Sequence, residues 1–367
     1  MTATADVVVV GAGVVGASVA YHLAARGARV IVVDRGAGPG AGSTARATGG
    51  FRAQFGSAIN VRLSLLARGK LERFSDEIGA DPGYKRAGYL FVARSAAELE
   101  ALAAARATQR SVGYDETVEV SPEEIARVQP GIRLDGVLGG SFGARDGFIK
   151  PMAILEGYLA AARRLGVSFV WDAAVTGMLR DGDRLAGVET AIAPLSSAWV
   201  VNAAGPWASE VGAMAGVAVP VEAGVRHVLP AEGMGGLDPN GPMTIFLEDG
   251  FHFRIRDGRA LLLRAGSLDE IETAARARVP ALDGVPVDRA AAWSGLYEDS
   301  PDGHAILGAV GNLVLANGSS GHGVMHSPAL GQLVSELILD GRTALDIHAL
   351  RPSRFAEGDI TPGVGLL

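Results

Sequence analysis

The N-terminal stretch of the chain alternates uncharged β-branched runs with glycine-rich turns. Residues 7–10 are four consecutive valines, a run typical of a parallel strand that is buried on both faces. A glycine-rich turn over 11–16 follows, and then a helical pattern over 17–26 that Gly27 is placed to end. Residues 30–33 repeat the buried-strand pattern. This order predicts a strand–helix–strand unit with a right-handed crossover.

The rest of the chain carries further helical and strand-like patterns. Apolar residues recur at helical spacing over 152–165, between a proline and a glycine that suit a helix start and a helix end. Two strands should flank a hairpin turn at 181–183. The remaining expectations are an exposed helix over 96–110, a helix start at the capping sequence 121–124, strands over 167–171, 199–201 and 313–316, short strands between Pro and Gly turns over 220–299, and a helix over about 328–339.

These elements predict an α/β fold in which one domain is assembled from separated pieces of the chain. We expect a Rossmann-like dinucleotide-binding domain over 1–85, 146–212 and 300–360. A second, α+β domain built on a mainly antiparallel sheet should be inserted between these pieces, over 86–145 and 213–299. The chain of 367 residues is long enough for two such cores.

Composition and charge exclude several classes of function. The net charge is −7 and no Lys/Arg-rich block is present, so we expect no nucleic-acid partner. The chain has no cysteine, which excludes disulfides, cysteine nucleophiles, thiolate zinc sites and iron–sulfur clusters. The uncharged run over 7–25 is broken by glycines and lacks a preceding basic region. We therefore expect no transmembrane segment and a cytoplasmic protein.

The sequence Gly11-Ala-Gly13-Val-Val-Gly16 matches the dinucleotide-binding pattern in its proper place, between a strand and a helix. Gly11 allows the tight turn, Gly13 allows a pyrophosphate to approach the backbone, and Gly16 allows close packing of helix on strand. Asp34, at the end of the second strand, is placed to bind a ribose diol, which disfavours NADP. The motif leaves FAD and NAD both open.

Four motifs in order give the chain a resemblance to a known family. They are residues 11–16, 42–50, 201–207 and 317–325. With them the chain resembles, over nearly its whole length, the D-amino-acid oxidase superfamily of FAD enzymes. The resemblance is strongest to its branch of sarcosine oxidases, glycine oxidases and amino-acid dehydrogenase β-subunits. It implies FAD as the cofactor and a Rossmann-like FAD-binding domain with an inserted substrate domain.

The resemblance also implies which residues bind FAD. Ser43 and Thr44 offer hydroxyl groups to a pyrophosphate, and the glycines near residue 320 let the main chain approach the flavin ring. Because there is no Cys, and no His within 42–50, the resemblance implies non-covalent FAD. We expect no metal. The candidate FAD-binding residues are Gly11, Gly13, Val14, Val15, Gly16, Asp34, Arg35, Ser43, Thr44, Ala45, Thr48, Gly49, Gly50, Val175, Ala203, Gly205, Trp207, Gly318, Gly321, His322, Gly323, Val324 and Met325.

On the substrate side, the resemblance implies oxidation of a C–N bond by hydride transfer to the flavin. Arg52 is the candidate carboxylate-binding residue, because a guanidinium matches both oxygens of a carboxylate. His252, Tyr297, His322 and Met325 are the further catalytic candidates. For Arg52 the alternative is an ordinary ion-paired arginine, and for His252 and Tyr297 a structural role in the core.

The electron acceptor and three rival functions stay open at this point. Met325 stands where sarcosine oxidases carry a lysine, and Arg264 aligns loosely with their oxygen-activating lysine. The substrate is expected to be a small amine or amino acid, and the acceptor either oxygen or an electron-carrier protein or subunit. The rivals are an NAD-linked dehydrogenase, a hydroxy-acid or glycerophosphate-type flavin oxidoreductase, and a non-catalytic flavin-binding subunit of a larger complex.

Overall fold

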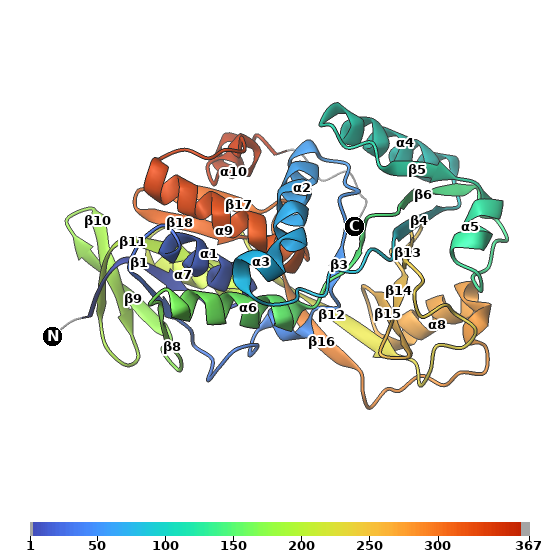
Figure 1. The fold of residues 1–367 in the computed structure, drawn as a ribbon, viewed down its shortest axis with the longest axis horizontal. Coiled ribbons are helices and arrows are strands. Elements are labelled where there is room, and N and C mark those ends of the chain that lie inside the picture. Colours follow the sequence, from blue (N-terminus) through green and yellow to red (C-terminus); the bar gives the residue numbers. More distant parts are fainter. Residues whose placement is uncertain (1–2, 361–367) are drawn as a thin grey trace.

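The computed structural model describes residues 3–360, which form two large sheets lying side by side (Figure 1) and one small sheet of two strands. The first has eight strands, with a central path in the order β17-β18-β11-β1-β2-β8. The pairs β1–β2, β1–β11, β2–β8 and β11–β18 are parallel, as the predicted strand–helix–strand unit requires. Its strands are β1 (Ala3–Val10), β2 (Val30–Val33), β8 (Ser168–Val170), β9 (Val175–Asp181), β10 (Arg184–Thr190), β11 (Leu195–Asn202), β17 (Ile306–Val310) and β18 (Leu313–Asn317).

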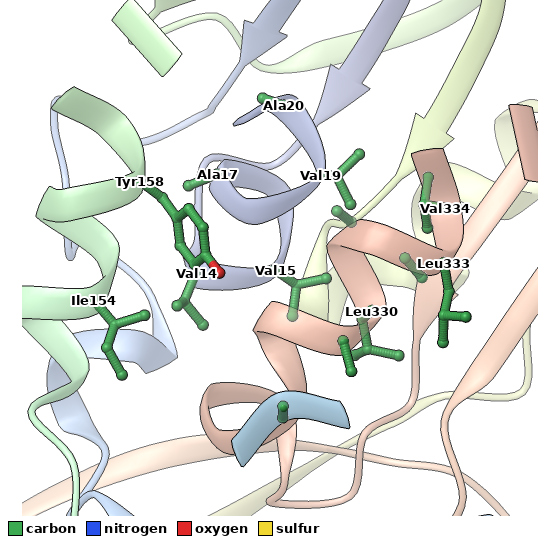
Figure 2. Packing of buried hydrophobic residues seen from close by; sticks show 14 of the residues in the cluster. Val14, Val15, Ala17, Val19, Ala20, Ile154, Tyr158, Leu330, Leu333 and Val334 are labelled. Carbon is green, nitrogen blue, oxygen red and sulfur yellow. The ribbon is translucent and has the colours of Figure 1, made fainter. Parts of the chain in front are cut away.

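Helix α1 (Val14–Ala24) packs between two helices from distant parts of the chain, α6 (Pro151–Arg164) and α9 (Gly323–Asp340). Figure 2 shows Ile154 and Tyr158 of α6 on one side of α1 and Leu330, Leu333 and Val334 of α9 on the other. The approach of α9 is close, because a Cβ added to Gly331 would lie 2.2 Å from the Ser18 hydroxyl oxygen. Burying these apolar faces positions the N-terminal end of α1.

Helix α9 begins at Gly323, earlier than the start near Pro328 that the sequence predicts. A proline inside a helix has no N–H to give to the carbonyl one turn back. Here that carbonyl, the oxygen of Val324, accepts a hydrogen bond from the Ser327 hydroxyl at 2.9 Å instead. The side chain next to the proline therefore supplies the missing donor, and the helix continues through it.

The second sheet also has eight strands, in the order β16-β12-β15-β14-β13-β4-β6-β5. All its neighbouring pairs are antiparallel except β4 with β13, so the predicted mainly antiparallel sheet is confirmed. The extent of each domain stays a prediction, and residues 1 and 2 of the first predicted segment lie outside the described residues. The strands of this second sheet are β4 (Tyr89–Ala93), β5 (Thr117–Val120), β6 (Gly139–Gly143), β12 (Glu222–Pro230), β13 (Met243–Phe246), β14 (His252–Arg256), β15 (Arg259–Arg264) and β16 (Trp293–Asp299).

Three helices pack on this second sheet, α4 (Ala96–Ser111), α5 (Pro122–Val128) and α8 (Leu268–Arg278). Helix α8 was not predicted, although Ser267 and Glu270 form the capping box that starts it. Helix α4 is exposed on one face only, because Leu102 and Ala105 are buried. The remaining elements are η1 (Ser43–Arg46), β3 (Gly50–Phe51), α2 (Ala58–Glu72), α3 (Phe74–Ile78), β7 (Gly147–Phe148), η2 (Gly205–Trp207), α7 (Ala208–Met214), η3 (Pro280–Leu282), η4 (His348–Leu350) and α10 (Arg354–Glu357).

No helix within residues 3–360 is long and apolar enough to cross a membrane.

Candidate active site

A cavity of about 530 Å³ lies at the carboxyl ends of the parallel strands β1, β2 and β11. This is where open α/β sheets bind their ligands. Among residues 3–360, eight segments line it: the turn before α1, the residues after β2, η1 with its flanking residues, residues 173–175, the segment 203–214, residues 295–298 of β16, Ala316 of β18, and the start of α9 with Gly321. The cavity is therefore assembled from both sheets and from all four sequence motifs.

The glycine turn before α1 has the geometry that its motif predicts. Gly11 adopts a φ of +104°, and a Cβ there would lie 2.3 Å from the backbone oxygen of Ala203. A Cβ on Gly16 would lie 1.9 Å from the Gly11 oxygen. At Gly13 an added Cβ would touch only the Thr44 hydroxyl oxygen, at 3.6 Å. Gly11 and Gly16 therefore shape the turn, whereas Gly13 leaves space beside the helix N-terminus for an anion.

Asp34 is held at the cavity wall by two backbone amides. Its Oδ2 accepts from Ala12 N at 2.6 Å, and its Oδ1 accepts from Gly36 N at 2.7 Å. A carboxylate oxygen can accept more than one hydrogen bond, so each oxygen can still bind a ribose hydroxyl. Beside it, the Arg35 guanidinium lies 4.7 Å from the centre of the Trp207 ring.

The hydroxyl groups of Ser43 and Thr44 support the same ligand. Thr44 Oγ1 accepts from Val14 N at 3.2 Å, which fixes η1 against the start of α1. Ser43 Oγ is buried, lines the cavity region and has no hydrogen-bond partner among residues 3–360. A buried hydroxyl without a partner costs free energy, and a bound phosphate would supply its acceptor. The cavity thus fits a dinucleotide, with Asp34 at the ribose and Gly13 and Ser43 at the pyrophosphate.

Most of the predicted FAD residues line this cavity, and some do not. Gly49 has a φ of +77°, and its turn lies against the backbone of Ile149. Met325 is buried in the main hydrophobic core. The predicted residues that line the cavity are Gly11, Gly13, Val14, Val15, Asp34, Arg35, Ser43, Thr44, Val175, Ala203, Gly205, Trp207, Tyr297, Gly321, Gly323 and Val324. Those outside its lining are Gly16, Ala45, Thr48, Gly49, Gly50, Arg52, His252, Gly318, His322 and Met325.

Arg52 is 3% exposed and lies among aromatic rings. Its guanidinium carbon is 4.2 Å from the ring centre of Phe55 and 5.2 Å from that of Phe91. Nη1 donates to the Gln54 carbonyl at 3.3 Å, and Nη2 donates to His322 Nε2 at 3.2 Å. Burial lowers the pKa of Arg52 from its usual value. An arginine side chain nevertheless stays protonated in proteins. The structure therefore holds a positive charge in apolar surroundings.

Two neutral histidines lie near this charge. Burial and the Arg52 charge lower the pKa of His322 well below its ordinary value. Since His322 Nε2 accepts from Arg52, its ring proton is on Nδ1. Burial also lowers the pKa of His252, whose Nδ1 lies 2.9 Å from the Gly250 carbonyl oxygen. A carbonyl only accepts, so His252 Nδ1 donates and its Nε2 carries the lone pair.

Tyr297 joins this group to the cavity. Its ring lies against Gly321, where an added Cβ would be 2.4 Å from Tyr297 Cε2. Burial raises the pKa of Tyr297, and the charge of Arg52 lowers it in part. The structure thus brings Arg52, His252, Tyr297 and His322 together, whereas Met325 packs in the core. Within residues 3–360, no group of three or more His, Asp or Glu residues is arranged to hold a metal ion.

Three charged residues that the sequence analysis did not single out also belong to this region. Asp146 accepts from Ala53 N at 2.8 Å and from Gln54 Nε2 at 3.1 Å, which fixes the segment directly after Arg52. Burial raises the pKa of Asp146 to about 6. Arg254 donates to the Thr48 carbonyl at 2.6 Å and so holds the turn that contains the candidate FAD-binding residues Thr48 and Gly49. Glu298 lines the cavity itself. No motif marks them, because their partners lie far away in the sequence.

Comparison with known proteins then identifies the family. Residues 6–337 match the DAO family, described as FAD dependent oxidoreductase. The chain belongs to this family. FAD is therefore the cofactor for which the cavity is built, and the NAD-linked alternative is removed. The predicted family, fold class and cofactor are confirmed.

Individual relatives of this DAO-family chain cover nearly all of it. It is 30% identical to FAD-dependent oxidoreductase domain-containing protein 1 of Xenopus laevis, over 92% of this chain and 79% of that protein. It is 27% identical to 4-methylaminobutanoate oxidase (formaldehyde-forming) of Paenarthrobacter nicotinovorans, over 95% of this chain and 45% of the relative. The crystal structure of L-proline dehydrogenase from P. horikoshii matches with a TM-score of 0.91 and 27% identity, over 98% of this chain and all of that one. The chain spans about half the length of several curated relatives, at 45%.

Proposed function

We propose that this DAO-family protein oxidises the C–N bond of a small amino acid, secondary amine or imino acid. The observation that carries the proposal is the buried guanidinium of Arg52 beside Tyr297, which lines the FAD cavity. Two relatives support the substrate class by their names, since 4-methylaminobutanoate and L-proline both carry a carboxylate and a secondary amine. FAD, when bound, accepts the two electrons and the proton of a hydride.

Arg52 would bind the substrate carboxylate. A charge pair in apolar surroundings is stronger than the same pair in water, and the rings of Phe55 and Phe91 supply such surroundings. The planar guanidinium also orients the carboxylate, because two of its N–H groups can reach both oxygens. Fixing the carboxylate orients the neighbouring C–H and C–N bonds toward the cavity that Tyr297 lines.

His252 would accept the proton that the substrate ammonium must lose. A C–N bond is oxidised by hydride loss only when the nitrogen lone pair is available, so a protonated amine has to be deprotonated first. His252 is uncharged because burial lowers its pKa, and its Nε2 is the atom that can accept a proton. His322 uses its Nε2 to accept from Arg52, and so it would hold Arg52 in place.

The electron acceptor is proposed to be oxygen or an electron-carrier protein or subunit. A curated relative named sarcosine oxidase subunit beta, 26% identical over 96% of this chain, favours the carrier or subunit. Arg264 also favours a carrier or subunit over oxygen. It aligns loosely with the oxygen-activating lysine of sarcosine oxidases, but its Nε donates to Asp249 at 3.0 Å, in an ion pair away from the cavity lining.

The test is reduction of the bound FAD without oxygen, by matched pairs of amines with and without a carboxylate. Proline is compared with pyrrolidine, and sarcosine with dimethylamine. Arg52→Ala should weaken binding of the acids by roughly 2–5 kcal/mol, as for loss of one partner of a buried charge pair. Arg52→Lys should recover only part of this, because an ammonium cannot reach both oxygens in one plane.

One control variant makes the result interpretable. Arg29→Ala removes an exposed arginine paired with Asp6 and should change neither class of substrate. An equal loss for acids and plain amines in the Arg52 variants would show that Arg52 supports the fold instead. Reduction by hydroxy acids or glycerophosphate, but by no amine, would favour that rival function. If none of these compounds reduces the FAD, the result would favour the rival function of a non-catalytic flavin-binding subunit.

A further inference from the structure

Glu298 lies on β16, next to Tyr297, and lines the FAD cavity. The position of the ligand follows from the other lining residues: Asp34 faces the ribose of adenosine, and the turn 11–13 with Ser43 faces the pyrophosphate. The glycines near residue 320 are those predicted to approach the flavin ring, and Glu298 lies against them, because a Cβ added to Gly323 would be 3.4 Å from Glu298 Oε1. We therefore assign this part of the wall to the flavin part of FAD. Glu298 is the carboxylic acid in that part of the lining.

The carboxyl group of Glu298 is only half satisfied by the protein. Its Oε1 accepts from Ser319 N at 3.2 Å, in the turn before α9. Its Oε2 is covered and has no hydrogen-bond partner within residues 3–360. Leaving a buried carboxylate oxygen without a donor is costly, and a proton or a ligand group removes that cost. The Glu298 carboxyl group can therefore gain or lose a proton when the charge in the cavity beside it changes.

Burial places the pKa of this carboxyl near neutral pH. It raises the pKa of Glu298 to about 7, the amide and hydroxyl of Ser319 and the amide of Gly318 act in the opposite direction, and repulsion from Asp299 adds a smaller increase. Arg226 on β12 donates to Asp299 at 3.2 Å and lies over the ring of Tyr297. In the facing turn, His322 is uncharged because its pKa is lowered.

Two further charged side chains near this wall are exposed to solvent, Arg46 on η1 and Glu210 on α7. Their charges are screened by water and change little when a ligand binds. Arg226 pairs with Asp299, and Glu298 Oε2 has no hydrogen-bond partner among residues 3–360. An added negative charge in the cavity would therefore act directly on the proton affinity of Glu298.

We propose that Glu298 takes up a proton when the bound flavin is reduced. Hydride transfer brings two electrons and one proton to the flavin, and the ring system is then more negative than before. An ionised Glu298 beside it would be repelled, and protonation of its carboxylate by solvent removes that repulsion. The substrate loses the hydride, the flavin gains it, and Glu298 changes from carboxylate to carboxylic acid. The inference needs bound FAD but no amine substrate.

The test is the midpoint potential of the FAD-loaded protein as a function of pH, measured with dithionite and redox mediators. Each proton taken up per two electrons changes the potential by about 29.6 mV per pH unit. The uptake by Glu298 begins where the oxidised protein has lost this proton, above about pH 7. There the slope in wild type should exceed that of Glu298→Gln by about 30 mV per pH unit.

Glu210→Gln is the matched control, since it removes one carboxylate from the cavity wall at an exposed position. It should keep the steep wild-type slope. Equal slopes in wild type and Glu298→Gln would overturn the proposal, and weaker FAD binding with equal slopes would show that Glu298 only holds the cofactor. The absence of amine substrates keeps these outcomes separate from a failure of the proposed C–N oxidation.

If Glu298→Gln does not retain FAD, infrared spectroscopy of the wild-type protein tests the proposal instead. Its reduction above about pH 7 must produce the infrared absorption of a newly protonated carboxyl group. If no such absorption forms on reduction, Glu298 does not take up a proton.

Discussion

Replacing Gly13 with alanine should weaken FAD binding and leave the apoprotein about as stable as before. Gly13 precedes α1 with φ −67° and ψ 179°, values that alanine adopts without strain. Its Cβ would touch only the Thr44 hydroxyl oxygen, at 3.6 Å, an ordinary contact. Alanine gains about 0.4–1 kcal/mol by restricting the unfolded chain and loses a similar amount as a poorer helix N-cap. The two effects oppose each other.

The methyl group added at Gly13 would occupy the space that the pyrophosphate needs. Moving the phosphate away from the helix N-terminus loses at least one charge-assisted hydrogen bond, worth about 1.5–3 kcal/mol. The dissociation constant for FAD should therefore rise roughly tenfold to over a hundredfold.

Gly11→Ala is the matched comparison, because it makes the same chemical change two positions away. Gly11 has a φ of +104°, and its Cβ would lie 2.3 Å from the Ala203 carbonyl oxygen, a backbone atom at the end of β11. Backbone strain of this kind costs about 1–3 kcal/mol, and the overlap adds to it. The Gly11 variant should therefore lose stability in the apoprotein itself.

Urea denaturation of the apoproteins measures their stability, and fluorescence titration with FAD separately measures the affinity for the cofactor. Wild-type FAD affinity in Gly13→Ala would refute the placement of the pyrophosphate over Gly13. Equal stability of the Gly11→Ala and wild-type apoproteins would refute the strained turn.

Two further predictions concern the cofactor. Asp34→Ala should weaken FAD binding by about 1.5–3 kcal/mol for each charged hydrogen bond lost to the ribose, roughly tenfold or more in affinity, measured by reconstitution of the apoprotein; unchanged affinity would argue against Asp34 as the ribose ligand. Because the chain has no Cys and no His within 42–50, we propose that FAD is held non-covalently, and acid precipitation should release intact FAD into the supernatant. Yellow colour that stays with the precipitate would contradict this.

Features whose structure depends on residues close together in the chain could be predicted from the sequence. The buried runs that become β1 and β2, the glycine turn and Asp34 lie within about thirty residues, and each has a local requirement such as a positive φ or a close approach. The capping box of α5 was predicted for the same reason. That of α8 carried an equally local signal at Ser267 and Glu270 and was overlooked.

The candidate substrate site was only partly predictable, since resemblance named its residues but no local pattern joins them. Arg52 and His322 form a hydrogen bond across 270 positions in the sequence. Asp146 reaches Gln54 across 92 positions and fixes the segment directly after Arg52. Such pairs depend on how the two sheets are brought together, which spacing along the chain does not express.

By itself, then, the sequence determined the dinucleotide turn, the strands around it and the absence of cysteine chemistry. Tertiary structure alone decided that Met325 packs in the core, that α9 continues through Pro328, and that Glu298 lines the cavity with one oxygen that has no hydrogen-bond partner among residues 3–360. The physical reason is that backbone conformation is set mainly by adjacent residues. The charge state of a carboxyl or imidazole is set by burial and by charges that only the folded chain brings near.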